Sequence, residues 1–243
     1  MIKRLKTKNF TVLRDVDIAF SPDLNVIIGE NGSGKTHVIK LLYSVLAARA
    51  SGGDGGSQFR QRLSEKLRRV FMPLRLGRLT TRAQGRVGTE VCVGFDDKSQ
   101  DVRFSFATNS KEVVVRKAGG TAVDRPVYFP AKELLSIYPN FLSLYSEYDL
   151  PYDETYFDTI TLLGLPYPRG PHTSRFESLI SLIEDAVGGT IRLDRDGKTF
   201  HLLMRGEDER RGNMEIDLVA EGWRKLGMLT QVILNNSLKD GGC

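Results

Sequence analysis

A Gly-rich segment near the N-terminus carries residues whose types and spacing suit the binding of a phosphate group. Residues 29–36 read Gly-Glu-Asn-Gly-Ser-Gly-Lys-Thr, which fits the pattern G-x-x-x-x-G-K-[ST]. Glycine at three of these positions permits backbone angles and a close approach that a Cβ would block, so consecutive N–H groups can point at phosphate oxygens. The sequence therefore predicts a phosphate-binding loop formed by Gly29, Glu30, Asn31, Gly32, Ser33, Gly34, Lys35 and Thr36.

Two side chains at the end of this loop have specific roles in such a site. The Lys35 ammonium group is expected to reach the β- and γ-phosphates of a nucleotide, and the Thr36 hydroxyl is expected to bind Mg²⁺. A helix that begins near Lys35 would add the positive end of its dipole. The pattern thus predicts ATP and Mg²⁺ as ligands, whereas the less specific interpretation is a Gly-rich turn.

The elements around the loop match the context that the motif requires. Residues 1–10 and 12–20 alternate apolar and polar side chains and predict two strands, and the apolar run 24–28 predicts a short buried strand. From residue 37 onward the apolar positions follow helical spacing. We therefore expect a buried strand to enter the loop and an amphipathic helix to leave it.

The remainder of the chain divides into segments of different periodicity. Residues 51–57 are rich in glycine and predict a flexible joint. The segment 51–125 then comprises a basic stretch and a three-stranded antiparallel meander, and 130–188 is expected to be a helical insertion within a single domain, 1–243. The later elements expected are a short strand at 126–130, helical spacing over 132–164, a helix at 176–187, a hairpin over 190–203, a strand near 214–219 and a helix at 226–238.

Composition limits the classes of protein to which the chain can belong. No apolar run is long enough to cross a membrane, and no apolar stretch follows the charged N-terminus as in a secretory signal. The two cysteines, Cys92 and Cys243, suffice neither for a disulfide framework nor for a metal cluster. We therefore expect a cytoplasmic protein without a membrane partner. The net charge of +5 permits an acidic partner without requiring one.

The N-terminal segment resembles a known family. The basic strand that ends in Lys8-Asn9-Phe10, a second strand, and then residues 24–36 with the phosphate-binding loop are similar to the ABC-type ATPases of the SMC, RecF and OLD group. Proteins of this kind, AAA-family ATP-binding proteins, occur in DNA repair, chromosome organisation and anti-phage defence. The resemblance implies two subunits that close head to tail over two ATP molecules, and thus an ATP-dependent homodimer.

The resemblance implies two further landmarks near the nucleotide. A Q-loop follows the antiparallel meander in this family, and residues 127–134 occupy the corresponding place here. Because these residues include no Gln, Lys132 and Glu133 are the candidates for its role. The alternative is a plain loop before a helix. The family signature then begins a helix. Here Ala220 replaces the signature Ser, while Gly222 is retained and the helix N-terminus still offers N–H groups. The alternative is an ordinary strand-to-helix turn.

The acidic motif that completes a catalytic site in this family, Walker B, has no counterpart in this sequence. Residues 91–97 imitate its apolar run and Asp pair, but they precede the Q-loop position and lie among predicted hairpin strands. The catalytic residues are therefore unknown. We expect either that the chain is truncated or that another chain supplies the motif, so its status as an enzyme stays open.

Two charged runs allow both a functional and an ordinary interpretation. The segment Arg60–Arg86 holds nine Lys or Arg residues and one acid, and is a candidate for binding DNA or RNA. A solvated helix face that buries Leu63, Leu67 and Val70 is an equally good explanation. The acidic run 147–158 indicates a solvated face or a partner surface rather than a metal site.

These observations lead to one main interpretation and one alternative. The predicted fold is α/β: a P-loop NTPase core of the ABC-ATPase type with an N-terminal antiparallel β-subdomain and an inserted helical lobe. The predicted function is that of an ATP-binding P-loop ATPase, a hydrolase in its complete form, that dimerises on ATP and couples binding or hydrolysis to a DNA-related or anti-phage defence process. The alternative is a non-hydrolysing nucleotide-binding scaffold that recruits an effector protein such as a nuclease.

Overall fold

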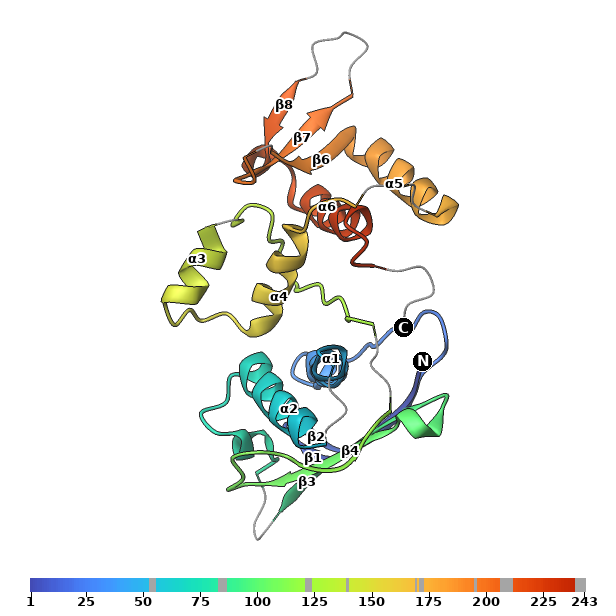
Figure 1. Cartoon of the computed structure of the whole chain (residues 1–243), viewed down its shortest axis with the longest axis vertical. Helices are drawn as coiled ribbons and strands as arrows, with labels where there is room; N and C mark the ends of the chain where they lie inside the picture. Colours follow the sequence, from blue (N-terminus) through green and yellow to red (C-terminus); the bar gives the residue numbers. More distant parts are fainter. Residues whose placement is uncertain are drawn as a thin grey trace. The chain divides into compact units, whose positions relative to one another are not determined.

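The chain forms two compact units, each with its own core. A computed structural model describes residues 1–52, 56–82, 87–120, 124–138, 140–168, 170, 173–194, 196–205 and 212–238. The first unit covers residues 1–126 and the second begins at Val127 (Figure 1). Each unit is described by itself below. The predicted positions of Arg86 and of the last five residues lie outside the described part of the chain.

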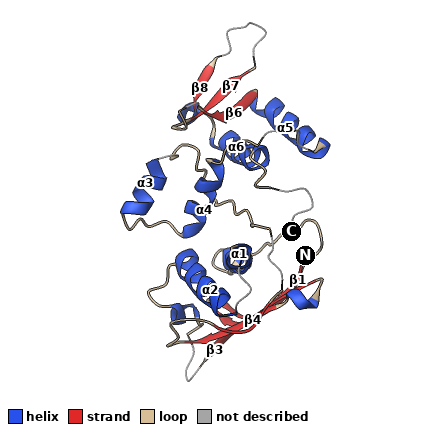
Figure 2. Cartoon of the chain, viewed as in Figure 1, coloured by secondary structure: helices blue, strands red, loops and turns tan. Residues whose placement is uncertain are grey.

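A five-stranded antiparallel sheet forms the base of the first unit (Figure 2). Its strand order is β2-β1-β3-β4-β5, so the N-terminal hairpin continues directly into the later meander. The hairpin and the meander predicted from period-two alternation are both confirmed. The strands are β1 (Ile2–Phe10), β2 (Leu13–Ala19), β3 (Gly88–Phe95), β4 (Val102–Ala107) and β5 (Val114–Ala118).

Two helices bury one face of this sheet. The core combines strand residues such as Leu5, Val93 and Phe104 with Leu41 of α1 (Lys35–Ala50) and Leu63 of α2 (Gly56–Phe71). Because strand side chains alternate, the residues between the buried ones face the opposite side of the sheet and remain accessible. Short 3₁₀ turns occur at Leu76–Leu79 and Lys98–Gln100.

The buried strand predicted immediately before the loop is wrong for the described chain. Residues 24–28 form no ladder, and Leu24, Val26 and Ile28 are 80%, 72% and 86% exposed. Only Ile27 packs against the core. An apolar run becomes a buried strand only where a neighbouring strand satisfies its backbone and a second layer covers its side chains. Among the described residues no strand pairs with this segment.

The second unit combines helices with a small three-stranded sheet. Its helices are α3 (Asn140–Glu147), α4 (Glu154–Leu163), α5 (Ser174–Val187) and α6 (Glu221–Leu234), with a 3₁₀ turn at Ile216–Leu218. The sheet runs β6 (Gly189–Leu193), β7 (Phe200–Met204) and β8 (Asn213–Glu215), antiparallel throughout. The predicted α5 and the hairpin after it are confirmed, and Gly188 ends α5 with a φ of 75°.

Two boundaries in this unit differ from those predicted. Residues 126–130 form no strand, because none of the described strands pairs with them. The last helix begins at Glu221 rather than at residue 226 and ends at Leu234. The first three residues of the helix are exposed, and regular apolar spacing begins only at Leu226, after its first turn.

The mixed α/β class predicted from the sequence is confirmed. No helix among the described residues combines the length and the apolar character needed to cross a membrane.

Candidate functional site

The predicted phosphate-binding loop leads directly into α1. Gly32 and Gly34 have φ values of 82° and 98°, in the region that glycine tolerates best, and α1 begins at Lys35. Gly34 is buried against the β1–β2 hairpin, and a Cβ built on it would lie 2.6 Å from Leu13 Cδ2 and 2.8 Å from Val12 Cγ2. The loop can therefore approach the hairpin this closely only with glycine at position 34.

The Lys35 side chain folds back over the loop. Its Nζ donates hydrogen bonds to the carbonyl oxygens of Gly29 at 2.6 Å and Glu30 at 2.7 Å. A turn in the loop is closed by the bond from Ser33 N to Glu30 O at 3.3 Å. The ammonium group thus lies at the loop itself, the position from which a lysine can contact bound phosphate oxygens.

Thr36 lies in the first turn of α1 with its side chain exposed. A hydroxyl oxygen is a ligand that Mg²⁺ accepts, and Mg²⁺ in nucleotide sites is usually held by one or two protein oxygens and by the substrate phosphates. The position and chemistry of Thr36 therefore fit the predicted role.

The next residue, His37, joins α1 to the hairpin turn, a contact that sequence reasoning missed. His37 Nδ1 lies 2.8 Å from Thr11 Oγ1, and the imidazole ring packs edge-on against Phe71. The Thr11 hydroxyl also donates to the carbonyl of Phe10 at 2.7 Å. It therefore accepts from His37 in the tautomer that carries the ring proton on Nδ1. Burial, together with the charge of Lys40, lowers the pKa of His37.

The two Q-loop candidates belong to the second unit. Lys132 lies over the ring of Tyr152, with Nζ 6.0 Å from the ring centroid. The Glu133 carboxylate accepts hydrogen bonds from the backbone N–H of Leu135 at 3.0 Å and Ser136 at 3.4 Å, and its other oxygen accepts from the Ser136 hydroxyl. Glu133 therefore stabilises the turn that follows it.

The signature candidates Ala220 and Gly222 lie at the exposed N-terminus of α6. Ala220 is the N-cap residue and provides no side-chain hydrogen bond, as expected for a methyl group. Two residues after Gly222, Arg224 Nε lies 3.5 Å from Glu133 Oε1. The structure thus joins the Q-loop candidate segment to the signature candidate helix, a pairing with no signal in the sequence because the two residues are far apart along the chain.

The Asp pair that imitates Walker B is used for structural contacts. Asp96 pairs with the N-terminal ammonium group at 3.3 Å and with Lys3 at 3.1 Å. Asp97 caps the turn Lys98–Gln100 by accepting from Ser99 N at 2.8 Å. Both residues follow a strand of the antiparallel sheet, which agrees with the rejection of this segment as Walker B.

The first part of the basic segment, residues 60–69, lies on α2, and the rest follows the end of that helix at Phe71. Leu63, Leu67 and Val70 are fully buried, as predicted for a solvated helix with an apolar stripe. Arg60 pairs with Glu112 at 3.2 Å, and Arg69 pairs with Glu65 at 2.7 Å. Part of the positive charge on this face is therefore already balanced by acidic side chains.

Comparisons with known proteins agree with the motif. Residues 1–85 match the AAA ATPase domain family. The chain is 45% identical over 49 residues to the DNA replication and repair protein RecF of Halalkalibacterium halodurans, which is 20% of this chain and 13% of that protein. It is 46% identical over 46 residues to the OLD nuclease of Thermus scotoductus, which is 19% of this chain and 8% of that protein. The matched segment thus spans a small fraction of the relatives' own length.

Solved structures give a weaker likeness. The SMC head domain from Thermotoga maritima aligns with 95% of this chain and 72% of its own, at 15% identity and a TM-score of 0.41. The recombination mediator protein RecF aligns with 76% of this chain and 46% of its own, at 18% identity and a TM-score of 0.36. Both TM-scores lie below 0.5, so the assignment rests on the sequence match of the N-terminal segment. Residues 1–85 are therefore similar to AAA ATPase domains, and a segment of 46–49 residues is similar to RecF and OLD proteins.

Proposed function

We propose that the chain binds ATP with Mg²⁺ through the loop Gly29–Thr36. The observation that carries this proposal is the position of Lys35, whose ammonium group already lies against the loop carbonyls of Gly29 and Glu30. A phosphate group entering the loop would replace two neutral acceptors with charged ones, and hydrogen bonds between charged partners are stronger. The exposed Thr36 hydroxyl would bind Mg²⁺, which supplies charge neutralisation at the phosphates.

The proposal is tested by substituting Lys35. ATP binding by the folded chain is measured with a fluorescent ATP analogue, for the unmutated protein and for Lys35→Ala. Loss of a charge-assisted hydrogen bond of about 1.5–3 kcal/mol predicts an affinity at least about tenfold lower. Lys111→Ala, which removes an exposed lysine between β4 and β5, is the matched control and leaves the affinity unchanged. Absence of ATP binding by the unmutated, folded chain contradicts the proposal.

For the complete protein we propose an ATPase that dimerises on ATP and acts in a DNA-related or defence process. The family match of residues 1–85 supports this role. Light scattering with and without ATP measures the dimer, and a shift from monomer to dimer mass on ATP addition is the expected result. We also propose that the basic segment Arg60–Arg86 contacts DNA or RNA, and that the protein recruits an effector protein. An unchanged monomer mass at saturating ATP contradicts the dimer.

A second function, a nucleotide-binding scaffold that hydrolyses little, is favoured by one observation. The Asp96–Asp97 pair, which imitates Walker B in the sequence, forms an ion pair and a turn cap at the end of an antiparallel strand. Release of inorganic phosphate by the purified chain separates the two functions. Steady release at saturating ATP, abolished by Lys35→Ala, supports an ATPase; ATP binding without release supports the scaffold.

A further inference from the structure

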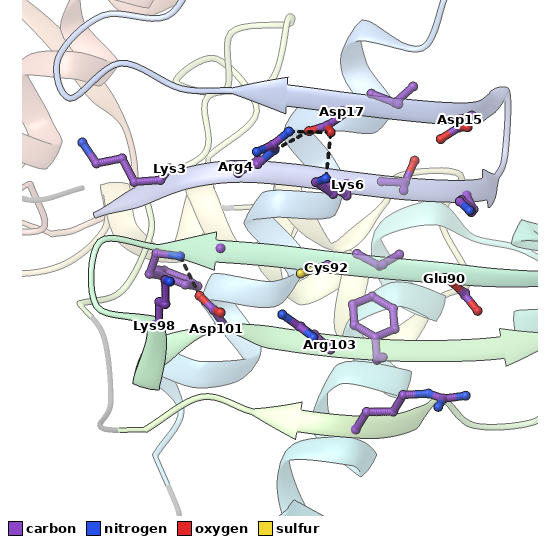
Figure 3. Close-up of a pocket in the computed structure, with 18 residues that line it drawn as sticks. Lys3, Arg4, Lys6, Asp15, Asp17, Glu90, Cys92, Lys98, Asp101 and Arg103 are labelled. Carbon is purple, nitrogen blue, oxygen red and sulfur yellow. Dashed lines mark hydrogen bonds and ion pairs between the residues drawn. The ribbon is translucent and has the colours of Figure 1, made fainter.

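The face of the first sheet that points away from α1 and α2 contains a hollow with a volume of about 780 Å³. Its floor is the central strand β3, which contributes the small residues Cys92 and Gly94 to this face (Figure 3). Larger side chains on the neighbouring strands rise on both sides of this floor. The hollow therefore results from small residues on one strand between long residues on the strands beside it.

The walls of the hollow are cationic. Lys6 of β1 and Arg103 of β4 both register with Cys92, so one cation stands on each side of the thiol (Figure 3). Arg4 lies two residues before Lys6 on the same wall. Lysine and arginine outnumber aspartate and glutamate among the lining residues by seven to four. The hollow is therefore suited to an anion.

The charges on the two walls are balanced to different extents. Asp17 pairs with both Arg4 and Lys6, the latter at 2.9 Å, so a single carboxylate serves two cations. The hydrogen bonds from Arg4 and Lys6 hold the pKa of Asp17 well below its usual range. Arg103 on the opposite wall has no acidic partner among the described residues. Its guanidinium fork can still bind two oxygens of an anion.

Each end of the hollow holds an acidic side chain together with basic ones: Glu90 registers with Lys8, and Asp101 pairs with Lys117. Glu90 lies at one end along the strand direction, and Asp101 lies at the other (Figure 3). Asp101 is held there because it accepts a hydrogen bond from Phe95 N at 3.0 Å and pairs with Lys117 at 3.6 Å. A compact anion beside Cys92 would lie between Lys6 on one side and Arg103 on the other.

We propose that this hollow binds a compact phosphate-bearing anion between Arg4 and Lys6 on one wall and Arg103 on the other. Arg103 would donate hydrogen bonds to two phosphate oxygens. Arg4 and Lys6, which have one carboxylate between them, would face the remaining oxygens. The site is separate from the loop Gly29–Thr36 and does not depend on nucleotide binding there. The phosphate group can come from inorganic pyrophosphate or from a free nucleotide.

Protection of the Cys92 thiol from alkylation tests the proposal. The full chain is prepared with two substitutions: Cys243→Ser leaves Cys92 as the only thiol, and Lys35→Ala weakens phosphate binding by the loop. This variant is treated with the neutral reagent iodoacetamide. Because protection follows 1 + [L]/Kd, pyrophosphate at four times its Kd slows alkylation about fivefold relative to sodium chloride of equal ionic strength. ATP is the second probe. If ATP protects Cys92 as well as pyrophosphate does, the ligand can be a free nucleotide; if it does not, the ligand is inorganic pyrophosphate.

Matched variants decide whether the hollow is the site. Arg103→Gln removes most of the protection, whereas Arg14→Gln, an exposed arginine on β2 that does not line the hollow, retains it. If Arg103→Gln does not fold by circular dichroism, Lys6→Gln carries the same test. Equal slowing by sodium chloride, or full protection in a folded Arg103→Gln, overturns the proposal. Protection by a single-stranded oligonucleotide without protection by pyrophosphate overturns the assignment to a compact anion.

Discussion

Arg224 Nε of α6 lies 3.5 Å from Glu133 Oε1, and both side chains are largely buried, 18% and 8% exposed. The same carboxylate caps the turn that contains Leu135 and Ser136. Glu133 therefore lies at ion-pair distance from a cation and caps a backbone turn at once, and it connects two segments of the second unit that are far apart in the sequence.

Glu133→Ala is expected to destabilise the second unit. It leaves a partly buried guanidinium without its carboxylate and two N–H groups without a cap, which costs about 2 kcal/mol of unfolding free energy. Urea unfolding followed by circular dichroism measures the change. Glu221→Ala, which removes an exposed carboxylate paired with Lys225 on α6, is the control and should cost less than about 0.5 kcal/mol. Equal effects of the two substitutions would show that the contact of Glu133 with Arg224 contributes nothing.

Gly34→Ala is expected to destabilise the first unit more than Gly32→Ala. Both glycines have positive φ, and a Cβ there costs about 1 kcal/mol. At Gly34 the added atom would also meet Val12 and Leu13 within 3 Å, whereas at Gly32 no atom lies within 4 Å. The overlap adds about 1–3 kcal/mol at Gly34 alone. Thermal unfolding of the two variants provides the comparison, and a Gly32→Ala as unstable as Gly34→Ala would refute the packing argument.

The ion pair of Asp17 with Arg4 and Lys6 predicts a loss of stability in acid. Because these hydrogen bonds lower the pKa of Asp17 in the folded chain, the stabilisation is present above the ordinary carboxyl pKa of about 3.9. It is lost as the pH falls below that value toward the folded pKa. Melting temperatures measured from pH 6 downward should fall less steeply in Asp17→Asn than in the unmutated chain. Asp15→Asn, on the same strand, is the control and should retain the full slope.

His37 predicts a second pH dependence, at higher pH. Burial lowers its pKa in the folded chain, so the neutral form is favoured and its contribution to stability is complete above the ordinary pKa of about 6.5. That contribution decreases as the pH falls through the lowered pKa. His37→Gln should remove the slope below pH 6.5, and NMR titration of the His37 ring gives the pKa directly. A measured value at or above 6.5 would contradict the prediction.

Local patterns were sufficient to predict most elements of the first unit. Alternation along β1 and the meander identified the strands, and helical spacing identified α1, because these patterns repeat within a few residues. The same reasoning failed for residues 24–28, whose apolar run resembles a buried strand while three of its side chains are exposed. Burial depends on which strand lies alongside, and the sequence of the segment does not contain that information.

The sequence by itself was enough to predict a phosphate-binding loop, since the spacing of Gly29, Gly34, Lys35 and Thr36 needs no distant residue. Only the tertiary structure decided what the loop packs against, that Glu133 pairs with Arg224, and that Lys6 and Arg103 flank Cys92. The reason is physical: a loop motif is encoded by the backbone preferences of adjacent residues, whereas cross-strand register and long-range ion pairs arise from the way that separate segments bury their apolar faces together.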